Sequence, residues 1–185
     1  MTRALIPLAA GCEELEAVTL IDLLRRAGIE VVVAGLAPGP VTASRGTVLV
    51  PDTTLAAVAD QAFDLIVLPG GLPGSDHLAA DPLLRRVLQR QDSERGLTAA
   101  ICAAPKVLAA AGLLAGKSAT CYPGALDASA HPDIRLLAEP VVVDGTVVTS
   151  RGPGTAMDFA LVLIERLAGR QRREEVEANL LRPGA

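Results

Sequence analysis

The class of fold is best predicted from one stretch of the sequence, Leu97-Thr98-Ala99-Ala100-Ile101-Cys102-Ala103-Ala104-Pro105. A short apolar run that leads into an alanine-rich segment predicts a buried strand followed by a helix. Cys102 lies at the turn between them, and the small side chains of Ala100 and Ala104 allow a tight bend. The first N–H groups and the dipole of the following helix favour a thiolate there, so we expect a nucleophile. The alternative is a cysteine that packs as a small apolar residue.

Length and composition indicate one α/β domain over residues 1–185. Half of the residues are hydrophobic, which is enough for a sizeable core. The formal net charge is −4 with mixed signs, so neither nucleic acid nor a membrane surface is expected as partner. The apolar stretch at the N-terminus is too short for a signal sequence, and no later run is long enough to span a bilayer. We therefore expect a cytoplasmic protein with a small substrate.

The rest of the chain alternates short β-branched runs with longer Ala/Leu patterns. This alternation predicts parallel strands joined by crossover helices. Val41–Val50 and Pro140–Asp144 are expected as hairpins or edge strands. The core strands are expected to be nearly continuous apolar runs covered on both faces, namely Arg3–Leu8, Glu30–Leu36, Asp64–Leu68, Leu97–Ile101 and Thr146–Ser150.

Capping residues predict where the main helices begin and end. The first helix is expected from about Glu13 to Ala27, with Gly28 in the left-handed position that follows a helix. Asp81-Pro82 predicts the start of another helix, because aspartate is a good N-cap and proline suits the first helical position. Thr155 is expected to open a third long helix, with Asp158 in a near capping box.

The residues after each strand are site candidates, because ligands bind outside the carboxyl ends of the strands in an open parallel sheet. Glu13, Glu14 and Glu16 follow the first strand, and their spacing selects none of them. Backbone N–H groups in Pro69–Gly74 form either an oxyanion hole or an ordinary turn. Arg151 follows the last strand, where it could receive an anion or satisfy strand-end carbonyls.

The cysteines Cys12, Cys102 and Cys121 form neither an even disulfide framework nor a C-x-x-C pair. They are therefore expected as free thiols, and a structural zinc site is not expected. For Cys12 and Cys121 an inert thiol is the simpler interpretation, although Cys12 follows the first strand and could lie near the site. Neither a metal nor a cofactor is expected.

Several motifs follow one another in an order that is specific when they are taken together: Glu13-Glu14-Leu15-Glu16, Arg26-Ala27-Gly28-Ile29, Val33-Ala34-Gly35-Leu36, Leu68-Pro69-Gly70-Gly71, Ala99-Ala100-Ile101-Cys102-Ala103-Ala104-Pro105 and Thr149-Ser150-Arg151-Gly152-Pro153-Gly154-Thr155. Over nearly its whole length the chain resembles the ThiJ/PfpI superfamily, and within it the branch of the parkinsonism-associated protein deglycase and the YajL-like proteins. The resemblance implies a flavodoxin-like three-layer sandwich, with a mostly parallel central sheet and helices on both faces. It also implies a homodimer without a cofactor.

The resemblance implies roles for particular residues. The glutamate of the family falls on Glu16, which would be a protonated acid that donates to the Cys102 thiolate, since like charges in a desolvated site raise one pKa. Gly71 and Ala103 would present a pair of backbone N–H groups to an oxyanion, with Gly70 as an auxiliary residue. Cys102 and Glu16 are thus the expected catalytic residues.

Tyr122 aligns with the site histidine of the animal members, so this chain lacks that imidazole. Tyr122 and Arg151 are therefore only auxiliary candidates. Related groups place a histidine directly after the nucleophile or a His-x-Glu pair near the end of the chain, whereas this chain has Ala103 and Arg151-Gly152-Pro153. A Cys-His protease or amidotransferase triad is thus disfavoured.

The family implies a cofactor-independent glyoxalase III or protein deglycase, acting on methylglyoxal, glyoxal or their early adducts with amino acids and proteins. The alternative hypothesis is an oxidative-stress sensor or redox-regulated chaperone, in which Cys102 oxidises without turnover. The first helix with Arg26 and the segment Ser44-Arg45-Gly46 match regions that pack across the twofold axis of the family's dimers. That helix face could equally remain solvated.

Overall fold

A seven-stranded sheet forms the centre of the structure, a computed structural model in which residues 1–182 are described. All neighbouring strands are parallel except β10 and β11, which form an antiparallel edge pair. In spatial order the strands are β10 (Val141–Asp144), β11 (Val147–Ser150), β7 (Leu97–Ile101), β6 (Leu65–Leu68), β1 (Arg3–Leu8), β2 (Glu30–Gly35) and β5 (Thr53–Thr54). The predicted core strands are all present, with ends that differ by at most one residue.

The order of the core strands is flavodoxin-like. Along the chain the sheet begins at β1, adds β2 on one side, and then adds β6, β7 and β11 on the other side. The direction of growth therefore reverses between β1 and β6. In sheets of this kind ligands bind at that switch point, outside the carboxyl ends of the strands.

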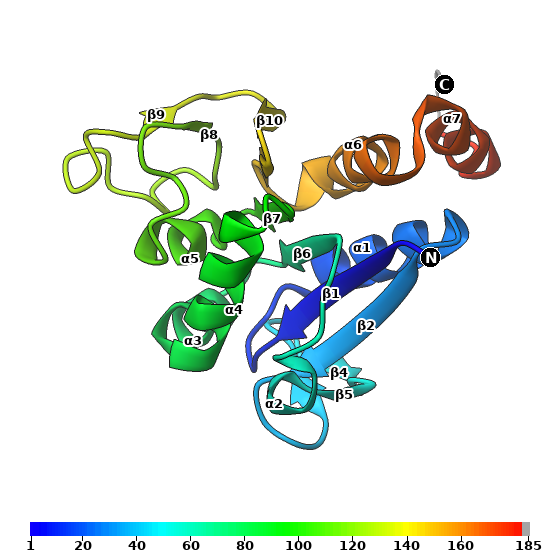
Figure 1. The fold of residues 1–185 in the computed structure, drawn as a ribbon, viewed down its shortest axis with the longest axis horizontal. Helices are drawn as coiled ribbons and strands as arrows, with labels where there is room; N and C mark the ends of the chain where they lie inside the picture. Colours follow the sequence, from blue (N-terminus) through cyan, green and yellow to red (C-terminus); the bar gives the residue numbers. More distant parts are fainter. Residues whose placement is uncertain (183–185) are drawn as a thin grey trace.

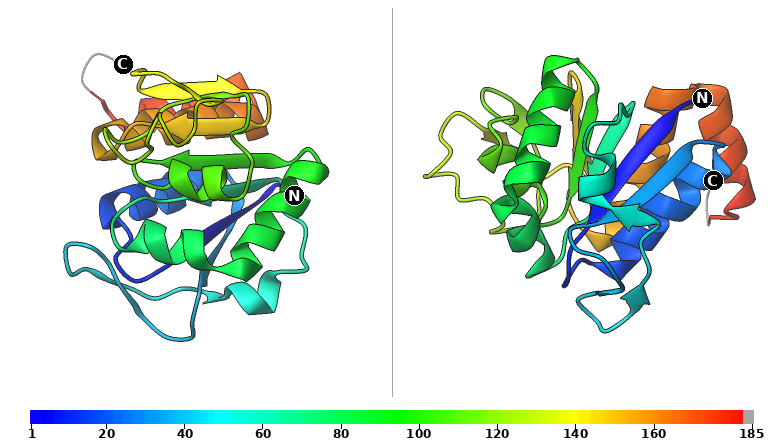
Figure 2. Two further views of the ribbon diagram at one scale, coloured as in Figure 1. Left: turned by 90° about the vertical axis from the view of Figure 1, so that its left-hand side faces the viewer. Right: turned by 60° about the horizontal axis from the view of Figure 1, so that its bottom comes forward.

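Helices cover both faces of the sheet, as Figures 1 and 2 show. On one face α1 (Glu14–Arg26) and α6 (Ala156–Ala168) close an apolar cluster, and α7 (Arg170–Asn179) packs against α6. A second cluster lies under the helices of the other face, which are α2 (Leu55–Val58), α3 (Gly74–Ala80), α4 (Pro82–Ser93) and α5 (Pro105–Ala110). The predicted three-layer α/β sandwich is thus confirmed.

Two small ribbons lie outside the main sheet. The predicted hairpin in residues 41–50 is present as β3 (Val41–Thr42) and β4 (Val48–Leu49). The predicted edge strand in residues 140–144 is β10. The parallel pair β8 (Ser118–Ala119) and β9 (Arg135–Leu136) was not predicted, because strands this short carry no detectable pattern.

The predicted helix ends are confirmed, including the start of α6 directly after Thr155. The Asp81 side chain accepts a hydrogen bond from the Leu84 N–H at 2.7 Å, and Gly28 adopts a φ of +76° just beyond α1. The predicted capping box at Thr155 is wrong, since its side chain makes no cap hydrogen bond to α6. A 3₁₀ turn, η1 (Pro153–Thr155), precedes α6, and the Thr155 hydroxyl instead donates back to the Gly152 carbonyl at 2.9 Å.

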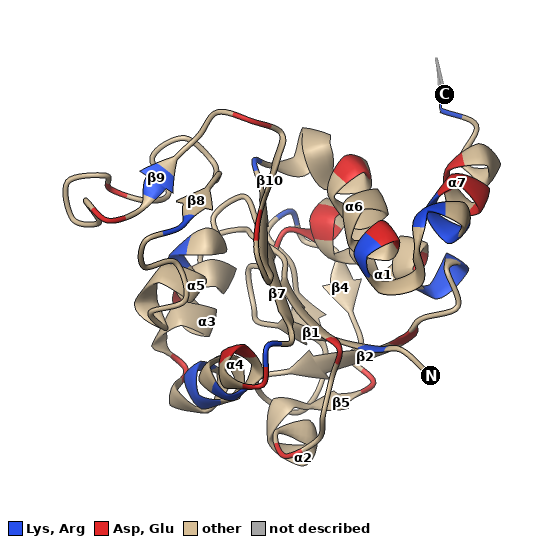
Figure 3. Ribbon diagram, turned by 45° about the horizontal axis from the view of Figure 1, so that its top comes forward, with Lys and Arg blue, Asp and Glu red and all other residues tan. Residues whose placement is uncertain are grey.

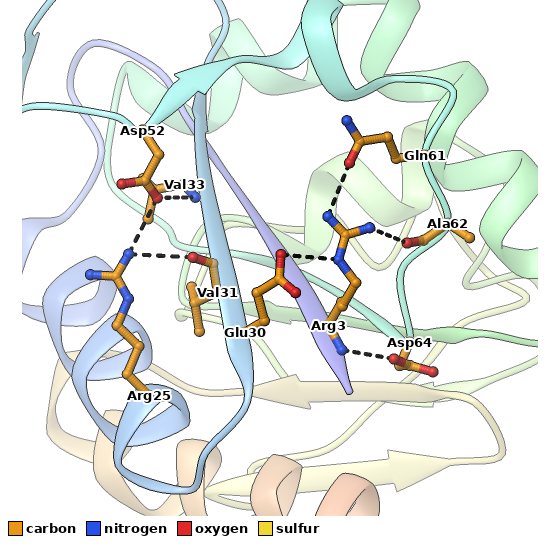
Figure 4. A network of polar contacts seen from close by, with 9 residues as sticks. All are labelled: Arg3, Arg25, Glu30, Val31, Val33, Asp52, Gln61, Ala62 and Asp64. Atoms are coloured by element: carbon orange, nitrogen blue, oxygen red, sulfur yellow. Dashed lines mark hydrogen bonds and ion pairs between the residues drawn. The ribbon is translucent and has the colours of Figure 1, made fainter. Parts of the chain in front are cut away.

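Two arginines tie the edge of the sheet together, away from the carboxyl ends of the strands (Figure 4). The Arg3 guanidinium donates to Glu30 Oε1 at 3.1 Å and to Gln61 Oε1 at 3.0 Å, which joins the start of β1 to β2 and to the segment before β6. Asp52 accepts from the Val33 N–H at 2.9 Å and from Arg25 at 3.2 Å. The Arg3 contacts hold the start of β1, whose carboxyl end contributes to the site, and the Asp52 contacts hold β2.

Charges of both signs mix on the outer helices (Figure 3). On α7, Arg170 pairs with Glu174 at 2.7 Å and Arg172 pairs with Glu175 at 2.9 Å. Exposed pairs of this kind stabilise a helix only slightly. The helix is therefore a solvated outer surface that is held mainly by Val176, which is buried against the core.

Candidate active site

The candidate site lies at the carboxyl ends of β1, β6 and β7, around the switch point of the sheet. The first turn of α1, which follows β1, carries Glu16. Gly70 and Gly71 follow β6, and Cys102 follows β7. The topology thus brings together residues that are far apart in the sequence, as the strand pattern predicts.

Cys102 occupies a sharp elbow. Its φ of +63° lies in the left-handed region, where a residue with a side chain is strained by about 1–3 kcal/mol. The Cys102 N–H donates to the Ser150 carbonyl at 3.0 Å, and the Cys102 carbonyl accepts from the Tyr122 N–H at 2.8 Å. Backbone contacts on both sides therefore hold the elbow in its strained form.

The structure corrects two details of the predicted elbow. Cys102 is only 9% exposed, so its thiol does not project freely into solvent. The helix α5 begins at Pro105 and is six residues long, so its dipole is small and begins beyond the nucleophile. The backbone groups that lie against the thiol are the N–H groups of Ala103, in the turn, and of Gly71, in the neighbouring loop.

Glu16 is fully buried beside Cys102. Its Oε2 accepts a hydrogen bond from the Gly70 N–H at 2.8 Å. Its Oε1 has no hydrogen-bond partner among residues 1–182. A buried carboxyl oxygen without a partner carries a desolvation penalty. Such an atom therefore marks a place where a proton or a substrate group can bind.

Burial raises the pKa of both members of this pair. For Glu16 burial outweighs the hydrogen bonds with the Gly70 N–H and the Cys102 thiol and raises the pKa to about 7. For Cys102 burial is the largest cause and the charge on Glu16 is the second, and together they raise the pKa to about 12. The expected lowering of the Cys102 pKa is thus not found, although the Gly71 and Ala103 N–H groups do act in that direction. Between these two pKa values the pair holds one proton and one negative charge.

Glycines let the backbone approach the pair closely. A Cβ atom on Gly70 would lie 2.7 Å from the Cys102 Cβ and 2.8 Å from Glu16 Oε2. Gly71 has a φ of +89°, and a Cβ there would lie 2.4 Å from the Glu13 backbone nitrogen. Any side chain at either position would displace the site. Gly70 therefore belongs to the site through its N–H group as well as through its small size.

Glu13 and Glu14 bind the loop of the β3–β4 hairpin, whereas Glu16 lies beside Cys102. Glu13 Oε2 accepts from the Ser44 hydroxyl at 2.9 Å, and Glu14 Oε1 accepts from the Arg45 N–H at 3.0 Å. Desolvation raises the pKa of Glu14, but the backbone N–H groups of Glu14, Arg45 and Thr47 and the Ser44 hydroxyl outweigh it and hold the pKa at about 2. These two carboxylates therefore fasten the hairpin loop.

Spacing over one helical turn could not separate the three glutamates. A longer window does contain a signal, because Leu20, Leu23 and Leu24 continue the buried stripe of α1 on which Glu16 lies. These residues follow Glu16 by four, seven and eight positions, which is the period of one helix face. An acidic residue on an apolar stripe is the signal that marks Glu16.

Tyr122 adjoins the site through its backbone N–H group, whereas the charge on Arg151 acts on another thiol. The Tyr122 ring is 53% exposed and passes close to Gly152, where a Cβ would lie 3.5 Å from ring atom Cδ2. The positive charge on Arg151 acts on the thiol of Cys121. Sequence reasoning missed Leu72, which is 57% exposed and directly follows Gly71. An apolar residue after a Gly-Gly pair was the available signal.

Cys12 and Cys121 are buried free thiols, as is Cys102. Burial, followed by the charge on Glu14, raises the pKa of Cys12 to about 11. Burial also raises the pKa of Cys121, against the lowering effects of the Leu126 N–H and Arg151. Cys12 packs in the same apolar cluster as Cys102, while Cys121 packs in the cluster on the other face of the sheet.

The turn after β11 satisfies its own polar groups. The Ser150 hydroxyl donates to the Pro140 carbonyl at 2.9 Å, and the Arg151 N–H donates to the same carbonyl at 3.1 Å. The Thr155 N–H donates to the Gly152 carbonyl at 2.9 Å. These contacts involve backbone groups and the Ser150 hydroxyl, so the two interpretations of the Arg151 side chain both stay predictions.

Among residues 1–182, no group of three or more His, Cys, Asp or Glu side chains is arranged to hold a metal ion. Over the same range, no helix combines the length and the apolar character that crossing a membrane requires.

Comparison with known proteins assigns the family. The model of the DJ-1/PfpI family matches residues 2–166. The chain belongs to the DJ-1/PfpI family. It is 49% identical over 179 residues to protein dj-1beta of Drosophila melanogaster, covering 96% of each chain. It is 44% identical over 182 residues to the Parkinson disease protein 7 homolog of Danio rerio, covering 97% of this chain and 96% of the relative. The resemblance to the ThiJ/PfpI superfamily and to this branch of it is thus confirmed.

Other DJ-1/PfpI comparisons bear on fold and on activity. The crystal structure of Drosophila melanogaster DJ-1beta superposes with a TM-score of 0.93 at 46% sequence identity, covering 98% of each chain. A Caenorhabditis elegans relative named glutathione-independent glyoxalase DJR-1.2 is 39% identical over 171 residues, covering 92% of this chain and 89% of that one. Proteins similar to this DJ-1/PfpI chain thus include one that is named as an enzyme.

Proposed function

We propose that this DJ-1/PfpI protein is a cofactor-independent glyoxalase, with Cys102 as nucleophile and Glu16 as proton carrier. The observation that carries the proposal is the buried Glu16 carboxyl beside Cys102, with Oε1 left without a partner. A nucleophile and an adjacent proton carrier are the minimum that carbonyl addition and isomerisation require. The name of the nematode relative supports the same activity.

The first step is addition of Cys102 to methylglyoxal. The Cys102 Sγ forms a bond to the aldehyde carbon, and the thiol proton passes to Glu16. The aldehyde oxygen becomes an oxyanion that accepts hydrogen bonds from the Gly71 and Ala103 N–H groups. Glu16 then returns the proton to this oxygen, which yields a hemithioacetal. The proton held by the Cys102–Glu16 pair thus serves both half-steps.

The second step moves a proton between two carbons. Glu16, again a carboxylate, removes the proton from the former aldehyde carbon and gives a proton to the neighbouring carbon through an enediol. The result is a thioester of a 2-hydroxy acid on Cys102. Water attacks this thioester, the S–C bond breaks and lactate leaves. One carbon is oxidised as its neighbour is reduced, so the reaction needs water but no external oxidant or reductant.

The same chemistry extends to glycated substrates. Early adducts of methylglyoxal or glyoxal with amines and thiols release the free aldehyde, or are attacked directly at the carbon that carries the adduct. We therefore propose free dicarbonyls and early protein or amino-acid adducts as one substrate class, which gives a deglycase activity.

Product analysis tests the proposal. Purified protein, checked for contaminating glyoxalase, should convert methylglyoxal to lactate, and the Cys102→Ala variant should lose at least about a thousandfold of this rate. Cys121→Ala is the matched control, since Cys121 packs on the other face of the sheet, and it should keep the parent rate. Lactate formation that is equal in the parent and Cys102→Ala proteins would refute the proposal.

A second candidate function is oxidation sensing at the same thiol. A sulfinate on Cys102 would accept hydrogen bonds from Gly71, Ala103 and a protonated Glu16, which are the groups that support catalysis. Mass spectrometry after graded peroxide distinguishes this function from general damage. Sensing predicts that oxidation stops at sulfinate on Cys102 while Cys12 and Cys121 stay reduced, and equal oxidation of all the cysteines would contradict it.

We also propose that the protein is a homodimer that pairs through α1. Leu15 and Val18 are about half exposed on this helix, and Val48 and Val50 are exposed at the adjoining hairpin. Exposed apolar side chains on neighbouring elements are typical of an interface. Sedimentation should give a dimer for the parent protein and a monomer for Val18→Glu, and a parent protein that sediments as a monomer would contradict the proposal.

A further inference from the structure

Two residues whose backbones adjoin the nucleophile carry exposed apolar side chains. Tyr122 is 53% exposed and Leu72 is 57% exposed, and both are among the large hydrophobic residues that face solvent. Each adjoins a backbone group of the site. The Tyr122 N–H is bonded to the Cys102 carbonyl at 2.8 Å, and Leu72 directly follows Gly71, whose N–H lies against the thiol.

The Tyr122 ring has a fixed seat. Its backbone N–H is held by Cys102, and its carbonyl accepts from the Ala125 N–H at 2.9 Å. One edge of the ring lies close to Gly152. A Cβ atom on Gly152 would lie 3.5 Å from the ring atom Cδ2. Because the Cys102 N–H bonds to Ser150, two residues before Gly152, this seat adjoins the nucleophile. A ring that is held at its base and open to solvent is suited to stacking against a flat ligand.

We infer that Tyr122 and Leu72 form an apolar rim that selects carbonyl substrates with an aryl or extended apolar substituent. The inference deepens the proposed function and rests on its nucleophile, Cys102. When Sγ bonds to an aldehyde carbon, the substituent on the neighbouring carbon would extend from the buried thiol toward these two exposed side chains. A methyl group or a hydrogen is too small to reach the rim, whereas a phenyl group can lie against Tyr122. Glyoxal and methylglyoxal would therefore gain less from the rim than phenylglyoxal.

Turnover provides the first test. The ratio of kcat/KM for phenylglyoxal to that for glyoxal should fall about three- to tenfold in Tyr122→Ala, which is the range of an aromatic contact. Tyr122→Phe should keep the ratio, because it keeps the ring. Leu72→Ala should lower the ratio less. The matched control is Val143→Ala, an exposed apolar residue on β10, which should leave the ratio unchanged. An unchanged ratio in Tyr122→Ala would overturn the inference.

Alkylation provides a test that does not depend on turnover. Phenacyl bromide and bromoacetone both transfer a carbonyl-bearing carbon to Sγ, with formation of an S–C bond and loss of bromide and a proton. The rate ratio at Cys102, read by peptide mass and divided by the ratio for a free thiol, should favour phenacyl bromide in the parent protein. It should fall about three- to tenfold in Tyr122→Ala. This fall in a protein without glyoxalase activity would sustain the rim and refute the glyoxalase, whereas active protein with no change in either ratio would refute the rim alone.

Discussion

The turns after β7 and β11 lie side by side, yet they differ in whether their polar groups have hydrogen-bond partners. After β11, hydroxyl and backbone groups bond to one another, with Ser150 Oγ 2.7 Å from Thr155 Oγ1. After β7, Cys102 is held in a strained conformation and the adjoining Glu16 keeps an oxygen without a partner. In a turn that only connects two elements, the polar groups form hydrogen bonds with one another. The turn after β7 has a strained backbone and adjoins an unsatisfied buried oxygen on α1, so chemistry is expected there.

The largest effect on activity is expected from Glu16, which adjoins the turn after β7. Glu16→Gln removes the proton carrier, so lactate formation should fall about 100- to 10,000-fold. The same change removes the negative charge that raises the Cys102 pKa, so alkylation of Cys102 by iodoacetamide at pH 8 should become faster. Peptide mass analysis and product analysis on one preparation measure both effects. Slower alkylation together with lost turnover would indicate a collapsed site and would contradict the assigned role.

A smaller effect is expected from a single methyl group added beside the turn after β7, on Gly70 of the neighbouring β6 loop, or in the turn after β11. Gly70→Ala places a Cβ 2.7 Å from the Cys102 Cβ and 2.8 Å from the Ile101 carbonyl oxygen, so kcat/KM should fall about a hundredfold as the nucleophile is displaced. The matched control is Gly154→Ala in the turn after β11, where a Cβ meets nothing within 4 Å. Equal kcat/KM values for these two variants would remove the distinction between the turns.

The pH dependence of kcat/KM reports on the Glu16 carboxyl beside the turn after β7. The pKa of Glu16 is raised to about 7 by burial. Below this value both Glu16 and Cys102 are protonated, and above it the pair keeps one proton and gains one negative charge. The value of kcat/KM should therefore rise about tenfold per pH unit up to about pH 7 and then level off. A pH profile over pH 5–9 measures this, and a rate that falls as the pH rises through 7 would contradict the shared proton.

The smallest effect on catalysis is expected in the turn after β11, whose polar groups bond to one another. Thr155→Val removes the hydroxyl that bonds to Ser150 Oγ, to the Gly152 N–H at 3.2 Å and to the Gly152 carbonyl. Loss of these buried contacts should lower the free energy of unfolding by about 1–3 kcal/mol. Urea unfolding measures the stability, and kcat/KM should stay within about twofold of the parent. A large loss of activity without a loss of stability would assign this turn to the site.

Most of the fold could be predicted from the sequence, because the core strands are continuous apolar runs and two helix ends carry local signals. The Asp81 side chain caps the start of α4, and Gly28 adopts a left-handed conformation just beyond α1. Thr155 was correctly predicted to open α6, but its capping box was not formed because its hydroxyl bonds back into the preceding 3₁₀ turn. The strands β8 and β9 were missed because pairing between distant segments, rather than their own composition, creates them.

The candidate site was predicted in position but not in its electrostatics. Cys102 was found because a strand end is visible in one segment, whereas the pattern of Pro69–Gly74 indicated only a glycine-rich loop and the family resemblance selected Gly71. Glu16 was selected only through the family resemblance, although the apolar stripe of α1 carried the same information. The direction of the Cys102 pKa shift could not be predicted, because burial and the charge on Glu16 depend on how α1 packs on the sheet.

The most direct test of the central claim, that Cys102 and Glu16 isomerise a dicarbonyl by proton transfer, is the isotopic content of the product. Methylglyoxal should be converted in D₂O by the parent protein and by Cys102→Ala, and the lactate should be examined by proton NMR. Transfer through Glu16, whose proton exchanges with solvent, predicts Cys102-dependent lactate with deuterium on the carbon that bears the hydroxyl group. Lactate that retains hydrogen on that carbon, or no Cys102-dependent lactate at all, would contradict the claim.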